Sequence, residues 1–333
     1  MTPHPPIPNR FIFVWDDNFL PYTAYLAIRA VAQRAEPESI TLLKTPELDG
    51  VPNFERLRRE IPCLVPININ LPAWLEESQL PCQQELLAAN DFLKAGNYYA
   101  SVSDLLRALY LYLHGGIYLD TDTLTLRPFT PLLGQGGFLA EEHILVDSKT
   151  WLENSPLRYF RTSPLTLARK VCSEASWGVP AFQAISPLYR RAVHNATMGF
   201  RARHPLMRDA LTRMSNRFHL VPKRRPILGP DALQDLIVEN QYEELAILPP
   251  QHFSPLGPTM TYQYFHHRSP KALTSLERRI VGDDTYAIHW SNNGTLAKAV
   301  PKNDAELLNL SRSQLFSSMA ARAVFPGGVP YSE

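Results

Sequence analysis

Cysteine is scarce in this 333-residue chain, neither sign of charge is in excess, and no long apolar run occurs. Cys63, Cys82 and Cys172 lie far apart without CxxC spacing, so the sequence predicts neither a thiolate metal site nor a disulfide framework. A reducing compartment fits this pattern best. The 33 basic and 32 acidic side chains nearly cancel, which leaves no global field that would favour nucleic acid. No secretion signal and no stretch of about 18 apolar residues is found, so we expect a cytoplasmic protein without a membrane span.

Hydrophobic residues make up 45% of the chain, which is enough to form a large core in one α/β domain or in two smaller ones. The first 70 residues alternate short apolar segments with segments of helical periodicity, which favours a parallel-type sheet flanked by helices. The expected strands are 10–15, 39–44 and 63–69, and the expected helices are 20–35 and 53–60.

Helices are also expected at 83–95 and at about 102–114, followed by a strand at 116–122. Beyond this strand the 30 prolines of the chain become frequent, and the helical segments are interrupted. We therefore expect residues 140–230 to form a helical excursion from the sheet. Its expected helices are 163–172, 185–200, 204–216 and 229–241, and strands are expected to return within 245–256 and at 285–291.

Two aspartates end the apolar strand at 116–122. Because side chains alternate along a strand, Tyr118, Asp120 and Asp122 are expected to share one face. Two converging carboxylates are costly unless a cation offsets their repulsion, and Mg²⁺ or Mn²⁺ binds carboxylate and phosphate oxygens together. A metal-diphosphate site is the functional hypothesis. A solvated strand end is the alternative, which a lone Asp-X-Asp pattern favours.

The preceding helix carries a second polar group. Ser101 and Asp104 have the spacing of a capping box, and Gly115 provides a helix stop. Asp104 and Arg107 are three residues apart and hence lie on one face, where both could reach a polyhydroxylated ligand. Helix capping by Asp104 and a surface ion pair of Arg107 are the alternatives.

Residues 98–129, "YYASVSDLLRALYLYLHGGIYLDTDTLTLRPF", resemble the signature of glycosyltransferases with a DXD sugar-binding region. That group includes fungal initiating α-mannosyltransferases and, more distantly, glucosylating bacterial cytotoxins. Weaker resemblances continue at 7–15, at Asn195 with the His-Pro at 204–205, at "LGP" 228–230 and in "YAIHWSNNG" at 286–294.

The resemblance implies the GT-A fold, a Rossmann-like mixed sheet, as a single domain over 1–333 in which 140–230 lies on the acceptor side. It implies that Asp122 binds Mn²⁺ or Mg²⁺ directly, that Asp120 binds ribose or donor sugar and reaches the metal through water, and that Asp104 and Arg107 hold sugar hydroxyls. His289 would be a third metal ligand or a diphosphate contact, and a packed core residue is the alternative. The residues implicated in substrate binding are Val14, Trp15, Ser103, Tyr118, Asn195, Trp290, Ser291 and Asn292. Trp290 could equally be a core tryptophan.

The function implied is that of a metal-dependent, retaining glycosyltransferase that moves a hexose from a nucleotide sugar, with UDP-glucose favoured over GDP-mannose. The acceptor is open: a small metabolite, a lipid head group or a protein. Glu141 and Glu142 could assist it, although a solvated acidic turn is the favoured alternative. A sugar-nucleotide-binding protein without activity, or a nucleotide hydrolase, is the other function class, and no P-loop supports the latter.

Overall fold

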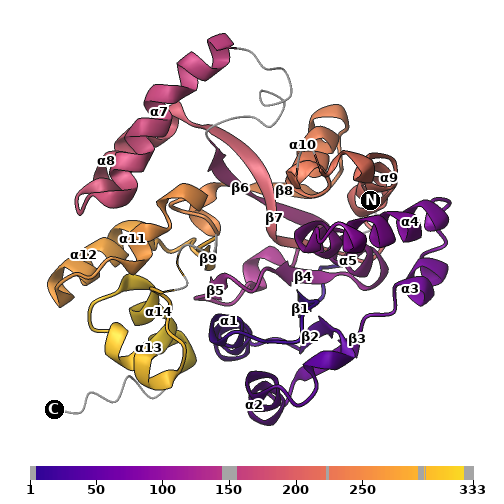
Figure 1. Cartoon of the computed structure of the whole chain (residues 1–333), viewed down its shortest axis with the longest axis horizontal. Helices are drawn as coiled ribbons and strands as arrows, with labels where there is room; N and C mark the ends of the chain where they lie inside the picture. The colour runs from indigo at the N-terminus through magenta and orange to yellow at the C-terminus, as the bar shows by residue number, and fades with distance from the viewer. Residues whose placement is uncertain (1–4, 145–155, 223–224, 292–295, 297, 326–333) are drawn as a thin grey trace.

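The computed structural model describes residues 5–144, 156–222, 225–291, 296 and 298–325. Its centre is a seven-stranded sheet with the strand order β3-β2-β1-β4-β7-β6-β8, and β5 and β9 form a second, two-stranded sheet (Figure 1). The strands are β1 (Arg10–Trp15), β2 (Ser39–Lys44), β3 (Leu64–Asn68), β4 (Gly116–Leu119), β5 (Thr123–Thr125), β6 (Gly137–Ile144), β7 (Arg190–Phe200), β8 (Leu245–Leu248) and β9 (Ala287–His289).

The central sheet is mixed, with parallel pairing in the majority. Strands β1, β2, β3 and β4 pair in parallel, as do β6 and β8, whereas β7 runs antiparallel to both β4 and β6. The α/β class predicted from the sequence, a mixed sheet between helices, is confirmed. The parallel strands bring the carboxyl ends of β1 and β4 to the same edge, where ligands bind in such sheets.

Helices cover both faces of this sheet. On one face lie α1 (Tyr22–Arg34), α2 (Pro52–Glu60), α11 (Tyr262–Phe265), α12 (Pro270–Ile280), α13 (Asp304–Leu310) and α14 (Leu315–Val324). On the other lie α3 (Leu71–Ser78), α4 (Gln83–Ala95), α5 (Tyr99–His114), α9 (Pro205–Arg217) and α10 (Pro230–Glu239). The helices α7 (Pro156–Glu174) and α8 (Gly178–Ile185) extend beyond one end of β6 and β7.

Short 3-10 turns punctuate the chain between these elements. They are η1 (Pro46–Leu48), η2 (Thr130–Leu132), η3 (Ser186–Leu188), η4 (Phe218–Leu220), η5 (Arg225–Ile227), η6 (Pro250–His252) and η7 (Pro258–Met260). Six of the seven contain a proline, which lacks the N–H donor that a longer helix needs. The exception is η4, which directly follows α9.

The central sheet separates two hydrophobic cores, and strand β1 contributes side chains to both. Phe11 and Phe13 belong to the core under α1 and α14, while Ile12 and Val14 belong to the core under α5 and α9. All four side chains are at most 7% exposed, because a parallel central strand is covered on both faces. Because β1 is buried on both faces, its carboxyl end is fixed, and Trp15 lies at that end beside a pocket.

The prediction of a helix at 185–200 is wrong, because residues 190–200 form β7 in the middle of the sheet. β6 also lies partly within the expected helical excursion. Residues 193–200 are all buried, so β7 contacts apolar layers on both sides and lacks the polar-apolar alternation that marks a half-exposed strand. The helices at 204–216 and 229–241 are confirmed within two residues at their ends, and the helix at 163–172 is confirmed as part of α7, which begins earlier, at Pro156.

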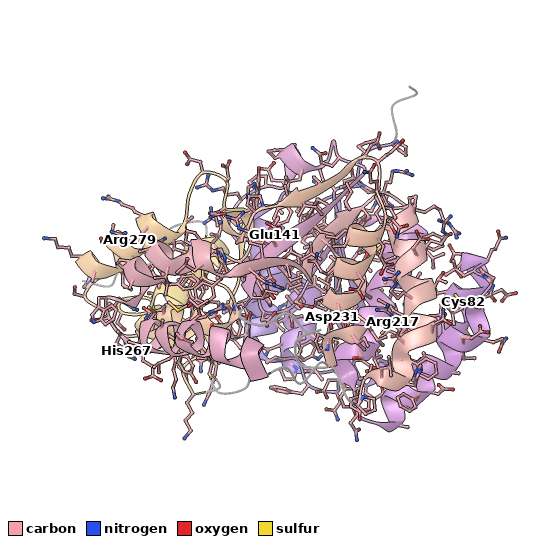
Figure 2. The ribbon with its side chains drawn as sticks, turned by 90° about the horizontal axis from the view of Figure 1, so that it is seen from above. Cys82, Glu141, Arg217, Asp231, His267 and Arg279 are labelled. Carbon is pink, nitrogen blue, oxygen red and sulfur yellow. The ribbon has the colours of Figure 1, made fainter. Side chains whose placement is uncertain are left out.

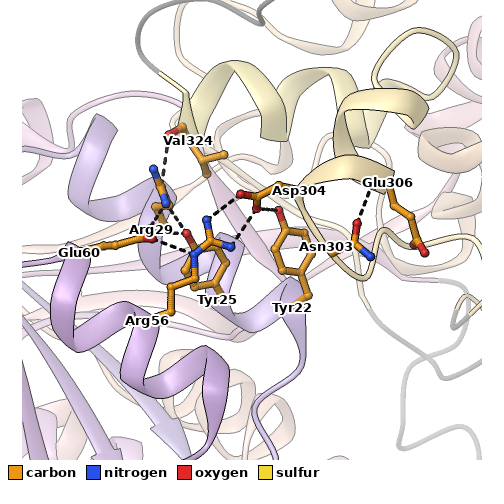
Figure 3. Close-up of polar contacts among 9 residues, drawn as sticks. All are labelled: Tyr22, Tyr25, Arg29, Arg56, Glu60, Asn303, Asp304, Glu306 and Val324. Carbon is orange, nitrogen blue, oxygen red and sulfur yellow. Dashed lines mark hydrogen bonds and ion pairs between the residues drawn. The ribbon is translucent and has the colours of Figure 1, made fainter.

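Side chains at the two ends of the chain join α13 to α1 and α2 (Figure 3). The hydroxyl of Tyr22 donates to Asp304 at 2.6 Å, and Arg56 donates to both carboxylate oxygens of Asp304 at 3.0 and 2.7 Å. Glu60 accepts from Arg56 at 2.8 Å and pairs with Arg29. The C-terminal helices are therefore fixed to the first helix of the chain by charged groups that are only partly exposed.

All three cysteines are free, as the sequence predicts. Cys82 lies on the helices at one end of the molecule, and His267 and Arg279 lie at the opposite end (Figure 2). None of the described helices combines the length and the apolarity that crossing a bilayer requires.

Candidate functional site

The two aspartates lie in the turn that joins β4 to β5. β4 ends at Leu119; the backbone N–H of Asp120 then donates to Ala196 at 2.8 Å, and the N–H of Thr123 donates to the carbonyl of Asp120 at 3.0 Å. The predicted strand at 116–122 is therefore too long. The carboxylates of Asp120 and Asp122 do converge, but because of this turn and not because of alternation along one strand.

His289 reaches the aspartates through strand pairing. β9 runs antiparallel to β5 and places His289 opposite Thr123, and the backbone N–H of Trp290 donates to the carbonyl of Asp122 at 3.1 Å. The Nε2 atom of His289 lies 3.3 Å from Oδ1 of Asp122. One ligand atom from each of Asp120, Asp122 and His289 lies within 4.8 Å of the others. The two carboxylates are ligands that suit Mn²⁺ or Mg²⁺, and the imidazole adds a nitrogen ligand that is typical of transition metals rather than of Mg²⁺.

The protonation of His289 shows how strongly this cluster favours positive charge. Burial by itself would lower the pKa of His289, but the neighbouring charge of Asp122, its hydrogen bond and the charge of Asp120 together raise that pKa to about 9. In the absence of a metal a proton on the imidazole offsets the two carboxylates. The negative charge of the two carboxylates, which raises this pKa, supports the cluster as a cation site.

Arg107 and Tyr118 hold Asp120 from the protein side. The guanidinium Nη1 of Arg107 lies 3.1 Å from Oδ1 of Asp120, and the hydroxyl of Tyr118 donates to the same oxygen at 2.6 Å. Arg107 also lies over the ring of Tyr118, 4.2 Å from its centroid, and donates to Ser103 Oγ at 3.0 Å and to the Asn195 carbonyl at 2.8 Å. Arg107 is 5% exposed, so it is no surface ion pair.

Asp104 is buried and bonded to Asn195 rather than to a helix end. Helix α5 begins at Tyr99, no side chain caps it, and Ser101 lies inside its first turns, so the predicted capping box is wrong. Asn195 Nδ2 donates to Asp104 Oδ1 at 2.6 Å. Burial raises the pKa of Asp104 to about 6, against the opposing effects of Arg107 and Asn195. A buried carboxyl group that titrates this close to neutral pH is typical of functional sites.

Gly229 packs against the side chains of Asp104 and Asn195. A Cβ atom built on Gly229 would lie 2.5 Å from Nδ2 of Asn195 and 2.8 Å from both carboxylate oxygens of Asp104. Only glycine allows the chain before α10 to approach this pair so closely. The "LGP" motif at 228–230 therefore has a local steric role in the site.

An open pocket of about 510 Å³ lies between the ends of β1 and β4 and the starts of α1 and α5. Val14, Trp15, Ser103, Arg107 and Tyr118, all predicted from the sequence, line it together with both aspartates. The sequence analysis missed Asp16, Asp17, Pro21, Thr23, Tyr99, Ala100 and Thr121, which also line it. The position of Asp16 and Asp17 directly after the carboxyl end of a β-strand is the signal that could have identified them.

Other predicted residues lie outside this pocket. Trp290 is 2% exposed and packs against the rings of Phe265 and Phe316 at 5.5 and 5.2 Å, which favours the core alternative. Ser291 has a positive φ of 47° and lies with Oγ 3.4 Å from Nδ1 of His289. Asn292 lies outside the described residues.

Glu141 and Glu142 lie on β6, so the acidic turn expected there is wrong. Glu141 pairs with Arg191 at 3.8 Å. Burial raises the pKa of Glu142, while the charges of His289 and Arg169 oppose that rise. Glu142 is thus the member of the pair whose charge interacts with that of His289.

His194 is a site residue that the sequence analysis missed. Its ring stacks on that of His289 with 5.5 Å between centroids, and its Nδ1 accepts from the backbone N–H of Ala196 at 3.2 Å. Burial and the neighbouring charge of His289 hold the pKa of His194 well below its usual value, so this ring is neutral. It supports the imidazole of His289 without competing for a proton.

Comparison with known proteins gives one family-model match, over part of the chain. Residues 47–139 match the family model of the glycosyltransferase sugar-binding region containing the DXD motif, and both aspartates lie in the match. No curated protein sequence matches the chain significantly.

Three solved structures resemble the chain weakly. The PaToxG glycosyltransferase is 15% identical over 95% of this chain and 87% of its own, with a TM-score of 0.46. The galactosyltransferase LgtC, solved with donor and acceptor sugar analogues, is 14% identical over 94% and 95%, with a TM-score of 0.43. Mouse xyloside xylosyltransferase 1 is 11% identical over 87% and 99%, with a TM-score of 0.45.

Proposed function

We propose that this glycosyltransferase, which carries the DXD sugar-binding region in residues 47–139, transfers a hexose from a nucleotide sugar in a metal-dependent, retaining reaction. The observation that carries the proposal is the cluster of Asp120, Asp122 and His289 beside the pocket at the end of β1. UDP-glucose is the favoured donor and GDP-mannose the alternative. Mn²⁺ or Mg²⁺ is the proposed metal.

The proposed donor position follows from the pocket walls. Val14 and Trp15, at the end of β1, would contact the nucleotide base, and the diphosphate would lie at Asp122, which lines the pocket, and at the neighbouring His289. A bound divalent cation would neutralise the diphosphate and stabilise it as a leaving group. Asp120, already oriented by Arg107 and Tyr118, would bind the ribose or the donor sugar and reach the metal through water.

The donor sugar is proposed to lie against Asp104, Arg107 and Asn195, with Ser103 and Tyr118 as further contacts. Asn195 and Gly229 fix the carboxyl group of Asp104, so this group is oriented before a ligand binds. Such preorganised polar groups contribute to catalysis by positioning the anomeric carbon and by stabilising developing charge. We name no general base, and the role of this chain in the reaction is positioning.

The acceptor is proposed to approach from the side of residues 140–230, within a single domain formed by the whole chain. Glu142 on β6 supports this side because its charge interacts with that of His289. A small metabolite, a lipid head group or a protein remains the candidate acceptor. Ser291 and Asn292 are proposed to lie over the diphosphate, and cytoplasmic location remains a proposal.

Mass spectrometry of nucleotide release tests the proposed activity. The purified protein is incubated with Mn²⁺ and a panel of donors that includes UDP-glucose and GDP-mannose. Asp122→Asn is expected to lower the rate of nucleotide release at least about 100-fold. Even residues that contact a bound metal only indirectly change metal affinity or activity about 10- to 100-fold. Asp283→Asn, which changes a fully exposed carboxylate, is the matched control and should match the wild type.

The other function classes give different results in the same experiment. Metal-dependent donor binding without any release would identify a silent binding protein. Cleavage of nucleoside triphosphates at a similar rate would identify a general nucleotide hydrolase. Release that survives Asp122→Asn unchanged would contradict the proposal.

A further inference from the structure

A second pocket, of about 560 Å³, lies between α7 and the chain from η7 to His266, away from the aspartates. Arg169 of α7 forms part of its wall and is 1% exposed. The guanidinium Nη1 donates to the His143 carbonyl at 3.0 Å, and its carbon lies 5.5 and 5.4 Å from the ring centroids of Phe182 and Tyr189. A positive charge is thus buried among two rings and one carbonyl.

Two of the three guanidinium nitrogens have no hydrogen-bond acceptor. Nε and Nη2 of Arg169 are buried and find no partner among the residues that the structure describes. Arg107, the deeply buried arginine beside the aspartates, instead pairs with Asp120 and donates to Ser103 and Asn195. Leaving a buried charge without a counterion is costly. Burial accordingly lowers the pKa of Arg169 to about 10, although Tyr189 and Glu142 oppose this effect.

Ser173 adds a second unused donor to the same wall. It follows Arg169 by four residues on α7, so the two side chains lie on one face of the helix. Ser173 is 4% exposed, lines the same pocket, and its Oγ has no partner among the described residues. Lys170 contributes a further positive charge to the pocket lining, while Glu174 contributes a negative one.

We propose that this pocket is a binding site for a small oxyanion, a phosphate or a carboxylate group, held by the guanidinium of Arg169 and the hydroxyl of Ser173. An oxyanion accepts hydrogen bonds only, and the unused groups here are donors. Its charge would compensate the buried guanidinium, which binds carboxylate and phosphate through parallel N–H groups. The ligand is a free anion or the acidic group of a larger molecule, and the proposal does not depend on sugar transfer.

Titration calorimetry with inorganic phosphate, and separately with acetate, tests the site in EDTA, which removes divalent metals. Wild-type protein is expected to bind phosphate, acetate or both, and the preference identifies the oxyanion. Arg169→Met is expected to weaken binding about 10- to 100-fold, the loss of one or two charged hydrogen bonds. The exposed Arg278→Met on α12 is the matched control and should leave the affinity unchanged.

Thermal unfolding without ligand provides an independent reading. Arg169→Met should unfold at the same temperature as wild type or higher, because a buried unpaired charge is replaced by an apolar chain of similar length. If this variant does not fold, Ser173→Ala replaces it, with an expected severalfold loss of affinity.

Three results would overturn the proposal. The first is the absence of phosphate and acetate binding to wild-type protein. The second is unchanged affinity in the folded Arg169→Met or, in its place, in Ser173→Ala. The third is loss of binding in Asp122→Asn, which would place the anion at the aspartate cluster. Mn²⁺-dependent nucleotide binding, measured in parallel, should be unaffected in Arg169→Met, so the two proposals fail separately.

Discussion

The Nε2 atom of His289 lies 3.3 Å from Oδ1 of Asp122, although the two residues belong to opposite halves of the chain. The pairing of β5 with β9 brings them together, and the backbone bond from Trp290 to Asp122 fixes the register. The cluster of Asp120, Asp122 and His289 therefore depends on the two-stranded sheet, and the aspartate motif alone does not define it.

Removing His289 should weaken metal binding without unfolding the protein. We expect His289→Ala to lower Mn²⁺ affinity by about 10- to 100-fold, since one of three candidate ligands is lost while both carboxylates remain. Titration calorimetry measures the affinity, and circular dichroism checks the fold. His219→Ala, at an exposed position, is the control. Equal Mn²⁺ affinity in both variants would remove His289 from the set of ligands.

Gly229→Ala should damage the sugar side of the site. The added methyl group must displace Asn195 or Asp104, because side-chain atoms of both residues lie within 2.8 Å of its position. We expect the kcat/KM for the donor to fall by about 10- to 100-fold, equivalent to about 1–3 kcal/mol of misplacement.

Gly134→Ala is the control for this prediction, because a Cβ at Gly134 meets nothing within 4 Å. In an Asp104→Asn background, Gly229→Ala should cost less than it does alone, since both changes disturb one carboxyl group. Strict additivity of the two effects would show that Gly229 does not act through Asp104.

Asp304→Asn should lower stability in a pH-dependent way. Hydrogen bonds from Arg56, and to a lesser extent from Tyr22, hold the pKa of Asp304 below its usual value despite the opposing effect of burial. The stabilisation is therefore fully present above the unfolded pKa of about 4 and is lost as pH falls through the lower folded value. We expect a loss of about 1 kcal/mol at pH 7, limited by solvent screening of this partly exposed group.

Urea unfolding at pH 7 and at pH 3 measures this difference. The difference in the free energy of unfolding between wild type and Asp304→Asn should be smaller at the lower pH, where the carboxylate becomes protonated. The exposed Asp283→Asn should show no gap at either pH. A gap that widens toward pH 3 would be incompatible with the depressed pKa of Asp304.

Trp290→Phe distinguishes the core role from a ligand contact. Because Trp290 packs between Phe265 and Phe316, a smaller ring leaves a cavity and should cost about 1–3 kcal/mol of stability. The KM for the donor, determined from initial rates, should remain unchanged. A raised KM with unchanged stability would instead identify Trp290 as a donor contact.

Local sequence patterns identified much of the site before any contact was known. The strand ending at Trp15 and the helix that carries Ser103, Asp104 and Arg107 lie where the sequence places them, whereas the aspartate pair lies in a turn after β4 and not in the predicted strand. The failures have particular causes. Asn195 was assigned to a helix because β7 is buried on both faces, and Ser101 was assigned to a cap because its spacing to Asp104 suits one.

The sequence by itself determined the α/β class, the position of the first three strands and the presence of two acidic residues directly after the apolar residues of β4. These features depend on neighbouring residues, whose apolar periodicity decides which faces are buried. Tertiary structure alone decided the partners of those acids: Arg107 and Tyr118 for Asp120, His289 for Asp122, and Asn195 with Gly229 for Asp104. Such partners come from distant segments, because the sheet order and the burial of whole faces, rather than local preference, set which strands meet.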